Sequence, residues 1–277
     1  MPTVADLLRR GSDLAGESAR RDTEILLCHT LNKTRAWLYT WPESHVELTH
    51  EREFVELLAL RKQGHPVAYL TGRREFWTLN LQVNEHTLIP RPETEALVEW
   101  ALALPLPTDS HVLDLGTGSG AIALALASER PDWQVAGIDA SLPALAVAKS
   151  NAREFGLERV RMCRSNWFDA LGEQCFHLLV SNPPYIVHGD AHLSAGDLRF
   201  EPRDALVAND QGLSDLATLV QDAPGHLHAG GWLLLEHGHE QGVPVRLLLA
   251  ERGFEKIETR KDLAGLDRIS GGCWCAK

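Results

Sequence analysis

An amide side chain stands at a rigid strand end in residues 181–185 (SNPPY), which directly follow an apolar run. Proline lacks a backbone N–H and keeps the preceding residue out of the helical region, so Pro183 and Pro184 predict a stiff, extended exit from a sheet. The side-chain oxygen of Asn182 and the carbonyl of Pro183 can hold both N–H bonds of a planar NH2 group, with the ring of Tyr185 beside it. Taken alone, the same residues also fit an ordinary proline-rich turn.

A second candidate site is a glycine-rich loop between a predicted buried strand and an Ala/Leu-rich helix. Gly116, Gly118 and Gly120 permit a tight turn and a close approach of a ligand to the backbone. The next predicted strand ends at Asp139, 23 residues after Gly116. A carboxylate at that spacing is typical of one that hydrogen-bonds two ribose hydroxyls. Together these features predict a site for a nucleoside-containing cofactor.

The loop favours S-adenosylmethionine over a dinucleotide. Its glycine spacing is G-x-G-x-G, whereas pyrophosphate at a helix N-terminus is associated with G-x-G-x-x-G. Asp114, which precedes the loop, suits a cationic amino-acid tail better than a diphosphate. A methyl donor also gives a purpose to residues 182–185, here called the clamp. When both N–H bonds of a delocalised nitrogen are held, the lone pair of that nitrogen is aimed at the methyl group.

The hydrophobic periodicity predicts the elements that must position these residues. Apolar side chains recur at helical spacing in residues 19–31 and 49–63, so residues 1–74 are predicted to form a small all-helical domain. In residues 75–90 the period changes to two, with turn residues at 84–86, which predicts a β-hairpin linker.

Residues 91–277 are predicted to form the catalytic domain. From residue 111 onward, short apolar strands alternate with helical stretches, which indicates an α/β fold with a mainly parallel sheet and helices on both faces. Ligands of such sheets bind at the carboxyl ends of the strands. The Gly116 loop, Asp139 and Asn182 are therefore expected at one edge.

Composition limits the partners and the cellular setting. The net charge of −11 argues against a broad phosphate-binding surface. No segment of signal-peptide type opens the sequence, and no stretch approaches the roughly 18 apolar residues of a membrane span. The five cysteines are odd in number and lack C-x-x-C spacing. We expect a cytoplasmic protein with reduced thiols, no membrane association and no direct nucleic-acid binding.

Four segments, residues 74–99, 114–131, 181–202 and 260–268, together carry a family resemblance. In this combination the chain resembles the protein-(glutamine-N5) methyltransferases of peptide chain release factors, which are class I S-adenosylmethionine-dependent methyltransferases. The resemblance covers nearly the whole sequence. It implies a Rossmann-like methyltransferase domain with a seven-stranded sheet, a small helical N-terminal domain and a β-hairpin linker.

The resemblance also implies an activity and a set of site residues. The activity is methylation of the glutamine in the Gly-Gly-Gln motif of class I release factors, with S-adenosylhomocysteine as the product and no metal. The implied catalytic residues are Asn182, Pro183 and Tyr185, and the implied substrate-binding residues are Asn182, Pro183, Pro184 and Tyr185. The implied cofactor-binding residues are Gly116, Thr117, Gly118, Ser119, Gly120, Asp139, Trp167 and Asn182. The separate, charge-neutral helical domain is expected to contribute to recognition of the protein substrate.

Other interpretations share part of this pattern. An adenine-amino (N6) methyltransferase of nucleic acid would use the same clamp but should add a basic recognition surface. A nicotinamide-dependent oxidoreductase would explain Gly116 and Asp139 and leave the clamp without a purpose. A non-catalytic cofactor-binding protein is a further alternative that the sequence leaves open. Metal binding is not predicted, because the histidine pairs at 188/192 and 237/239 lack a third ligand with convincing spacing.

For two further groups of residues, the sequence allows both a functional and a purely structural interpretation. Arg91, Glu93 and Glu201 either border the pocket or belong to a helix start and a surface turn. Trp37 and Trp41, four residues apart on a predicted helix, either fill the core of the helical domain or contact a partner.

Overall fold

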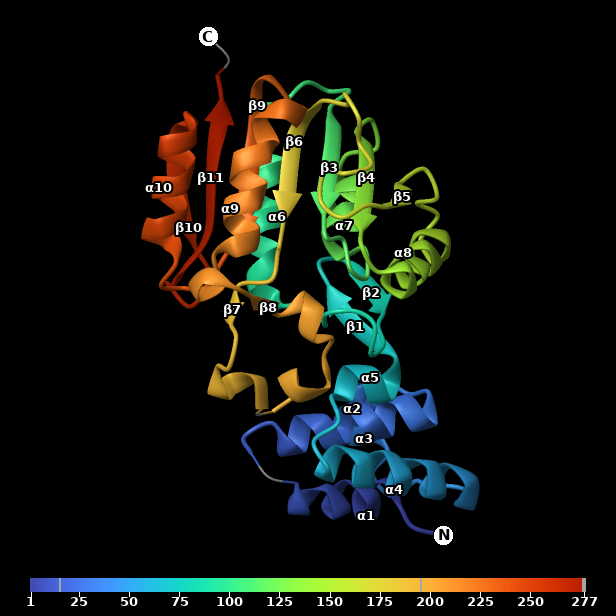
Figure 1. The fold of residues 1–277 in the computed structure, drawn as a ribbon. Coiled ribbons are helices and arrows are strands. Elements are labelled where there is room, and N and C mark those ends of the chain that lie inside the picture. Colours follow the sequence, from blue (N-terminus) through green and yellow to red (C-terminus); the bar gives the residue numbers. More distant parts are fainter. Residues whose placement is uncertain (15, 195, 276–277) are drawn as a thin grey trace. The chain divides into compact units, whose positions relative to one another are not determined.

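The computed structural model describes residues 1–14, 16–194 and 196–275, and its chain divides into two compact units (Figure 1). Met1–Arg73 together with Ser194–Phe200 form a helical unit, and Arg74–Leu193 together with Glu201–Lys277 form an α/β unit. The first stretch of the helical unit ends one residue before the predicted boundary at residue 74. The segment at 194–200 is an addition that periodicity did not indicate.

Amphipathic helices build the first unit around a small apolar core. Helix α2 has the predicted bounds, and it ends where Asn32 takes a left-handed conformation with φ 50°. Helix α4 is shifted by one residue from its prediction. Leu26 and Leu27 of α2 and Phe54 of α4 are fully buried in the same cluster. The helices are α1 (Val4–Arg10), α2 (Ala19–Leu31), α3 (Arg35–Thr40), α4 (Leu48–Lys62) and α5 (Val67–Thr71).

The described residues of Ser194–Phe200 contact the helical unit through charged side chains and a ring, and Arg199 donates to the carbonyl of Gln63. Arg61 of α4 donates from Nη1 to Oδ1 of Asp197 and from Nε to Oδ2 of Asp22, both at 2.8 Å. The rings of His65 and Phe200 lie 4.2 Å apart. Part of the loop that follows the SNPPY motif is thereby held by the helical unit.

The α/β unit is built on one large sheet. Its seven strands run in the spatial order β10-β11-β9-β6-β3-β4-β5. The strands of this sheet are β3 (His111–Leu115), β4 (Gln134–Asp139), β5 (Arg161–Arg164), β6 (Phe176–Ser181), β9 (Leu227–Glu236), β10 (Glu255–Lys261) and β11 (Asp267–Trp274). Two smaller two-stranded sheets pair β1 (Arg73–Phe76) with β2 (Leu79–Gln82) and β7 (Ile186–Val187) with β8 (Val207–Ala208).

The pairing of the strands confirms the predicted fold class. Strands β5, β4, β3, β6 and β9 are parallel to their neighbours within this series. Strand β11 runs antiparallel to β9, and β10 runs antiparallel to β11. The sheet is therefore mainly parallel and seven-stranded, which is the Rossmann-like arrangement expected for a class I methyltransferase.

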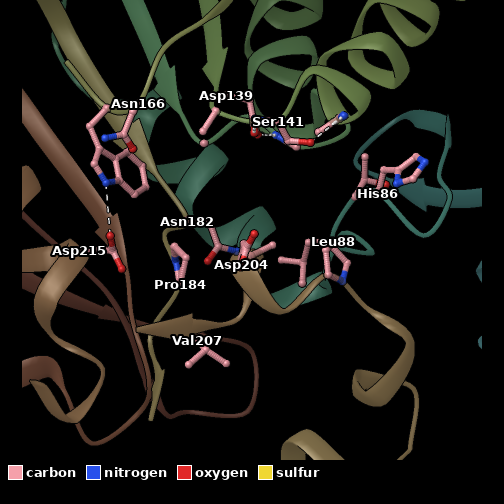
Figure 2. Close-up of a pocket in the computed structure, with 18 of the residues that line it drawn as sticks. His86, Leu88, Asp139, Ser141, Asn166, Asn182, Pro184, Asp204, Val207 and Asp215 are labelled. Atoms are coloured by element: carbon pink, nitrogen blue, oxygen red, sulfur yellow. Dashed lines mark hydrogen bonds between the residues drawn. The ribbon is translucent and has the colours of Figure 1, made fainter. Parts of the chain in front are cut away.

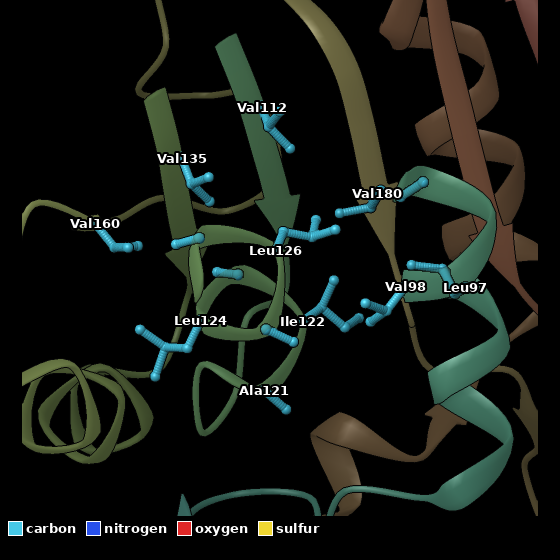
Figure 3. Packing of buried hydrophobic residues seen from close by; sticks show 14 of the residues in the cluster. Leu97, Val98, Val112, Ala121, Ile122, Leu124, Leu126, Val135, Val160 and Val180 are labelled. Carbon is cyan, nitrogen blue, oxygen red and sulfur yellow. The ribbon is translucent and has the colours of Figure 1, made fainter. Parts of the chain in front are cut away.

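Helices cover both faces of this sheet, as predicted. Alternate residues of β6 point to opposite faces: Val180 packs into the cluster that contains α6, α7 and α8, and Leu179 into the cluster that contains α9 and α10. Figure 3 shows Val180 beside Val98 of α6 and Ile122 of α7. The helices are α6 (Glu95–Ala103), α7 (Ala121–Glu129), α8 (Leu142–Glu154), α9 (Ser214–Asp222) and α10 (Gly242–Arg252).

The predicted hairpin has its turn in a different place. Trp77 and Thr78 connect β1 to β2, so the prediction of a turn at residues 84–86 between two strands is wrong. Trp77 takes a left-handed φ of 56°, and its backbone N–H donates to Oε1 of Glu95 at 2.9 Å. Residues 84–86 do form a turn, but the residues after it do not form a strand. The backbone N–H of Ile89 donates instead to the side chain of Glu201 at 3.0 Å.

Candidate active site

The strand ends of the large sheet bring the predicted site residues to one edge. Leu115 at the end of β3 pairs with Ser181 at the end of β6, and β4 ends at Asp139 beside β3. Because these strands are parallel, the residues that follow them leave the sheet on the same side. The Gly116 loop, Asp139 and Asn182 consequently line one cavity.

The cavity has a volume of about 610 Å³, which is in the range typical of small-molecule sites. Figure 2 shows Asp139, Asn182, Pro184 and Asp215 around it. Its charged lining consists of the carboxylates of Asp139, Asp204 and Asp215, and none of its lining residues is lysine or arginine. Such a lining favours a cationic ligand and disfavours a diphosphate.

The glycine loop leaves its backbone open to this cavity. Gly116 and Gly118 have φ values of +75° and +56°, and a Cβ on Gly118 would meet no atom within 4 Å. The N–H of Gly118 donates to Oδ2 of Asp139 at 2.9 Å, and the N–H of Ser141 donates to Oδ1 at 2.8 Å. Asp139 therefore fixes the loop and the start of α8, and it also lines the cavity.

Trp167 forms a wall of the cavity beside the glycine loop. A Cβ on Gly116 would lie 3.4 Å from the indole ring, which is ordinary van der Waals contact, so the positive φ of this residue favours glycine here and the ring does not. The indole N–H donates to Oδ1 of Asp215 at 3.3 Å, which orients the ring. Sequence reasoning missed Asp215, since an acidic residue in the first turn of a helix is ordinarily explained by the helix dipole.

The side chain of Asn182 is held from behind. Its Nδ2 donates to Oγ1 of Thr94 at 3.2 Å, which leaves the amide oxygen available as an acceptor. The hydroxyl of Ser181 donates to the carbonyl of Leu115 at 2.6 Å and ties the end of β6 to β3. Thr94 was missed because it lies 88 residues from Asn182 in the chain, and no local pattern connects the two.

The other residues of the clamp take different positions. Pro184 lines the cavity, whereas neither Pro183 nor Tyr185 is among the lining residues. The phenol of Tyr185 donates to Oε1 of Glu236 at 3.2 Å, and burial together with the negative charge of Glu236 raises the pKa of Tyr185. Tyr185 thus points its hydroxyl behind the clamp and stays protonated.

Asp114 lies beneath the glycine loop and not at its surface. The side chain is fully buried, and its Oδ2 accepts hydrogen bonds from the hydroxyl of Thr117 at 2.6 Å and from the N–H of Ala123 at 3.2 Å. Burial raises the pKa of Asp114 to about 7. The expectation that this carboxylate meets a cationic tail is therefore replaced by a supporting role for the turn.

Three more of the expected cofactor-binding residues support the loop from below. Thr117, Ser119 and Gly120 are not among the residues that line the cavity. The hydroxyl of Thr117 is engaged by Asp114, and the carbonyl of Ser119 accepts from Asn151 at 2.8 Å. Gly120 precedes α7 in a left-handed conformation with φ +87°.

Arg91, which is partly exposed, forms an ion pair with the buried Glu201 next to the cavity. Glu201 is 4% exposed, pairs with Arg91 and accepts the N–H of Ile89. The surface-turn interpretation of Glu201 is therefore wrong. Pro202, its neighbour, lines the cavity, so this pair holds the linker and the loop after the clamp together. Glu93 lies close enough to Glu236 to raise the pKa of that carboxyl.

Metal and membrane signals are lacking in residues 1–14, 16–194 and 196–275. No group of three or more His, Cys, Asp or Glu side chains there is arranged to hold a metal ion. Both ring nitrogens of His237 are engaged, one by Ser270 and one by the carbonyl of Gly238, each at 2.8 Å. No helix in the same residues has the length and apolar character needed to cross a membrane.

We predict that Asp114→Asn stabilises the protein at alkaline pH. The folded-state pKa of Asp114 lies at about 7, above its ordinary value of 3.8. The unfolded chain releases this proton near pH 3.8 whereas the folded chain keeps it up to about pH 7, so the wild type loses stability across this interval and the loss is complete above it. The variant cannot acquire a charge at this position. Its free energy of unfolding at pH 8 should exceed that of the wild type by about 1–3 kcal/mol, and the difference should shrink at pH 5.

Urea unfolding at the two pH values measures this difference. The exposed Asp132→Asn is the matched control and should follow the wild type at both. A constant difference for Asp114→Asn at pH 5 and pH 8 would contradict the assignment of the titrating group.

Comparison with known proteins places the two parts of the chain in one family. Residues 6–72 match the family described as the PrmC N-terminal domain, and residues 93–201 match the Methyltransferase small domain. A release factor glutamine methyltransferase of Pseudomonas aeruginosa is 50% identical over 274 residues, which is 99% of each chain. A protein of the same name from Xylella fastidiosa is 50% identical over 273 residues and 98% of each chain.

Solved structures support the fold. A methyltransferase from Pyrococcus furiosus superimposes with a TM-score of 0.56 over 82% of this chain and 99% of that chain, at 16% identity. That identity is low enough for the likeness to concern the fold alone. At 50% identity over nearly the full length of both curated relatives, the chain belongs to the family of release factor glutamine methyltransferases.

Proposed function

We propose that this protein transfers a methyl group from S-adenosylmethionine to the side-chain amide nitrogen of the glutamine in the Gly-Gly-Gln motif of class I peptide chain release factors. The observation that carries the proposal is the position of Asn182. Its amide oxygen is available at a rigid strand end, in the same cavity as the glycine loop and Asp139. The family of the chain supports the same substrate.

The cavity fits the proposed methyl donor. S-Adenosylmethionine supplies an electrophilic methyl group on a positively charged sulfur. The carboxylates of Asp139, Asp204 and Asp215 suit that charge, and the open backbone at Gly118 admits close contact. Asp139 would hold the ribose, and Trp167 would pack on the adenine. A nicotinamide dinucleotide would place a diphosphate against these carboxylates, with no lysine or arginine among the described lining residues to offset it.

The residues of the clamp would orient the substrate glutamine and would not act as an acid or base. The amide oxygen of Asn182 and the carbonyl of Pro183 would each accept one N–H bond of the substrate NH2 group. With both N–H bonds fixed, the nitrogen lone pair lies along the line of approach to the methyl group. The nitrogen gains one C–N bond, the methyl group leaves its sulfur, and the methylated amide loses one proton. The products are N5-methylglutamine and S-adenosylhomocysteine.

The helical unit is proposed to recognise the body of the release factor. Trp41, at the end of α3, is 56% exposed, and Tyr39 of the same helix is 49% exposed. Trp37 instead packs against the core of the unit, which agrees with the core-filling interpretation, while partner contact by Trp41 stays part of this proposal. Exposed aromatic side chains of this kind are enriched at protein interfaces.

Since release factors work in translation, the enzyme would act in the cytoplasm.

A methyl-transfer assay tests the proposed function. Purified protein is incubated with labelled S-adenosylmethionine and either a class I release factor or the same factor with its Gly-Gly-Gln glutamine changed to alanine. Label on the unchanged factor alone is the expected result. Label on both factors would overturn the proposed acceptor, and label on adenine-containing RNA or DNA alone would favour the alternative nucleic-acid activity.

We predict that Asn182→Ala keeps the cofactor but loses methyl transfer. The substitution removes one of the two acceptors that orient the substrate nitrogen, so kcat should fall by roughly two to four orders of magnitude. Calorimetry should give an affinity for S-adenosylmethionine within about threefold of the wild type, because Asp139 and the glycine loop are unchanged. Near-normal turnover would refute the orienting role of Asn182.

We predict that Trp41→Ala weakens recognition of the whole release factor. The substitution removes an exposed aromatic anchor, and the KM for the intact factor should rise about fivefold to tenfold. Transfer to a short peptide that contains Gly-Gly-Gln should stay unchanged. Leu263→Ala, at a side chain that is 96% exposed on the α/β unit, serves as the control. An equal loss on peptide and intact factor would count against recognition by α3.

A further inference from the structure

A buried carboxylate lies behind the clamp and is not used in the chemistry described so far. Glu236 is the last residue of β9 and is 1% exposed. Its neighbour Leu235 pairs with Ser181 of β6, so Glu236 and Asn182 leave the sheet side by side at the same edge. Oε2 of Glu236 is buried and has no hydrogen-bond partner among the described residues. A group of this kind costs stability, which calls for a functional explanation.

Two side chains connect Glu236 to the clamp. The phenol of Tyr185 donates to Oε1 of Glu236 at 3.2 Å. The hydroxyl of Thr94 lies close enough to the carboxyl of Glu236 to favour its charged form, and the unpaired Oε2 is the acceptor left for its proton, because Oε1 already accepts from Tyr185. Oγ1 of the same Thr94 accepts the hydrogen bond from Nδ2 of Asn182 at 3.2 Å. Thr94 thus stands between the buried carboxylate and the residue proposed to orient the substrate.

The direction in which the Thr94 hydroxyl donates its single proton determines which end of the Asn182 amide faces the cavity. A hydroxyl has one proton to donate and two lone pairs that accept. When the Thr94 proton is directed to a charged carboxylate, only its lone pairs remain for Asn182, and they can receive only the NH2 end of the amide. The oxygen of Asn182 then faces the cavity. If Thr94 donated to Asn182 instead, the amide would turn and present a donor to a substrate that needs an acceptor.

Charges on several elements act on this carboxyl. The pKa of Glu236 is raised to about 7, chiefly by burial and to a smaller extent by Glu93, which precedes α6. The interactions with Thr94 and Tyr185 and the positive charge of Arg268 on β11 act in the opposite direction and are already included in that value. The next residue, His237, is buried, and burial lowers its pKa, so it stays neutral near neutral pH.

We propose that Glu236 is a positioning residue for the methyl transfer: as a carboxylate it holds the Thr94 proton and thereby fixes the Asn182 amide with its oxygen toward the substrate nitrogen. The inference rests on the proposed function for its substrate. Glu236 itself touches neither substrate nor cofactor. Its effect reaches the reaction through Thr94, and through Tyr185 it also holds the backbone that follows the double proline.

Glu236→Gln is the direct test. Glutamine keeps the shape of the side chain, but its NH2 group can donate to Thr94 and so turn the Thr94 proton toward Asn182. At saturating substrates kcat should fall about tenfold to a hundredfold, with the affinity for S-adenosylmethionine and the KM for the release factor little changed. Glu240→Gln, on a side chain that is 88% exposed, is the matched control and should behave as the wild type.

Variants of Thr94 separate positioning from mere support of the fold. Thr94→Val keeps the shape and removes the hydroxyl, so it should lower kcat by a similar factor. Thr94→Ser keeps the hydroxyl and should retain most of the activity. Because both substitutions break the same chain of hydrogen bonds, the double variant Thr94→Val/Glu236→Gln should be little worse than either single variant. Additive losses would overturn the proposed route, and the comparison of Thr94→Val with Thr94→Ser stands even if Glu236→Gln fails to fold.

The pH profile gives a readout that a structural role would not change. In the wild type, kcat should fall as the pH is lowered through about 7, the pKa to which burial raises Glu236, because protonation of the carboxyl releases the Thr94 proton. Glu236→Gln should have a low kcat without this acid limb. An unchanged acid limb in Glu236→Gln would overturn the proposal.

A measurement without turnover distinguishes failure of this proposal from failure of the proposed function. The side-chain NH2 resonances of Asn182, followed by NMR in the full-length protein, should shift with pH near 7 in the wild type and not in Glu236→Gln. A wild-type protein that leaves release factors unlabelled yet shows this titration would refute the substrate and retain the positioning role. Asn182 resonances that ignore pH in the wild type would refute the positioning role.

Discussion

The parallel pairing of β6 with β3 on one side and β9 on the other determines the geometry of the site. Leu115, Ser181 and Leu235 lie in one row across these three strands. The residues that follow them differ in their surroundings, since Gly116 opens the glycine loop, Asn182 lines the cavity, and Glu236 is buried beside it and accepts a hydrogen bond from Tyr185. A slip of one residue in either pairing would send alternate side chains to the opposite face. The accuracy of the site therefore depends on the hydrogen-bonded core of the sheet.

Two buried acids below this row are costly for the folded state. Burial raises the pKa of both Asp114 and Glu236 to about 7, and each interacts with the hydroxyl of a threonine, Thr117 or Thr94. The first acid sets the turn of the glycine loop, and the second lies behind the clamp. Apolar residues there would give a more stable protein. The active edge therefore combines a tight glycine turn and buried acids with a sheet that is otherwise packed with aliphatic side chains.

Much of the fold could be predicted from the sequence, since periodicity and the glycine loop are local signals. The bounds of α2 and the parallel sheet with helices on both faces agree with those signals. The turn between β1 and β2 could not be placed, because Glu95 holds Trp77 from outside the hairpin. The partners of Asn182 and Tyr185, like Asp215, were missed for a similar reason: these contacts join residues 48 to 88 positions apart, and only the folded chain reveals them.

The assignment of Ser194–Phe200 to the helical unit has a consequence for how the protein can be recombined. The chain passes from one unit to the other at residues 73–74, again at 193–194 and a third time at 200–201. The helical unit is therefore not a contiguous module, and a single crossover between two related genes near residue 73 would separate Arg61 from its partner Asp197. A hybrid that exchanges the whole helical unit between relatives needs two inserts from the same parent, one of which is a short piece within the part of the gene that encodes the α/β unit.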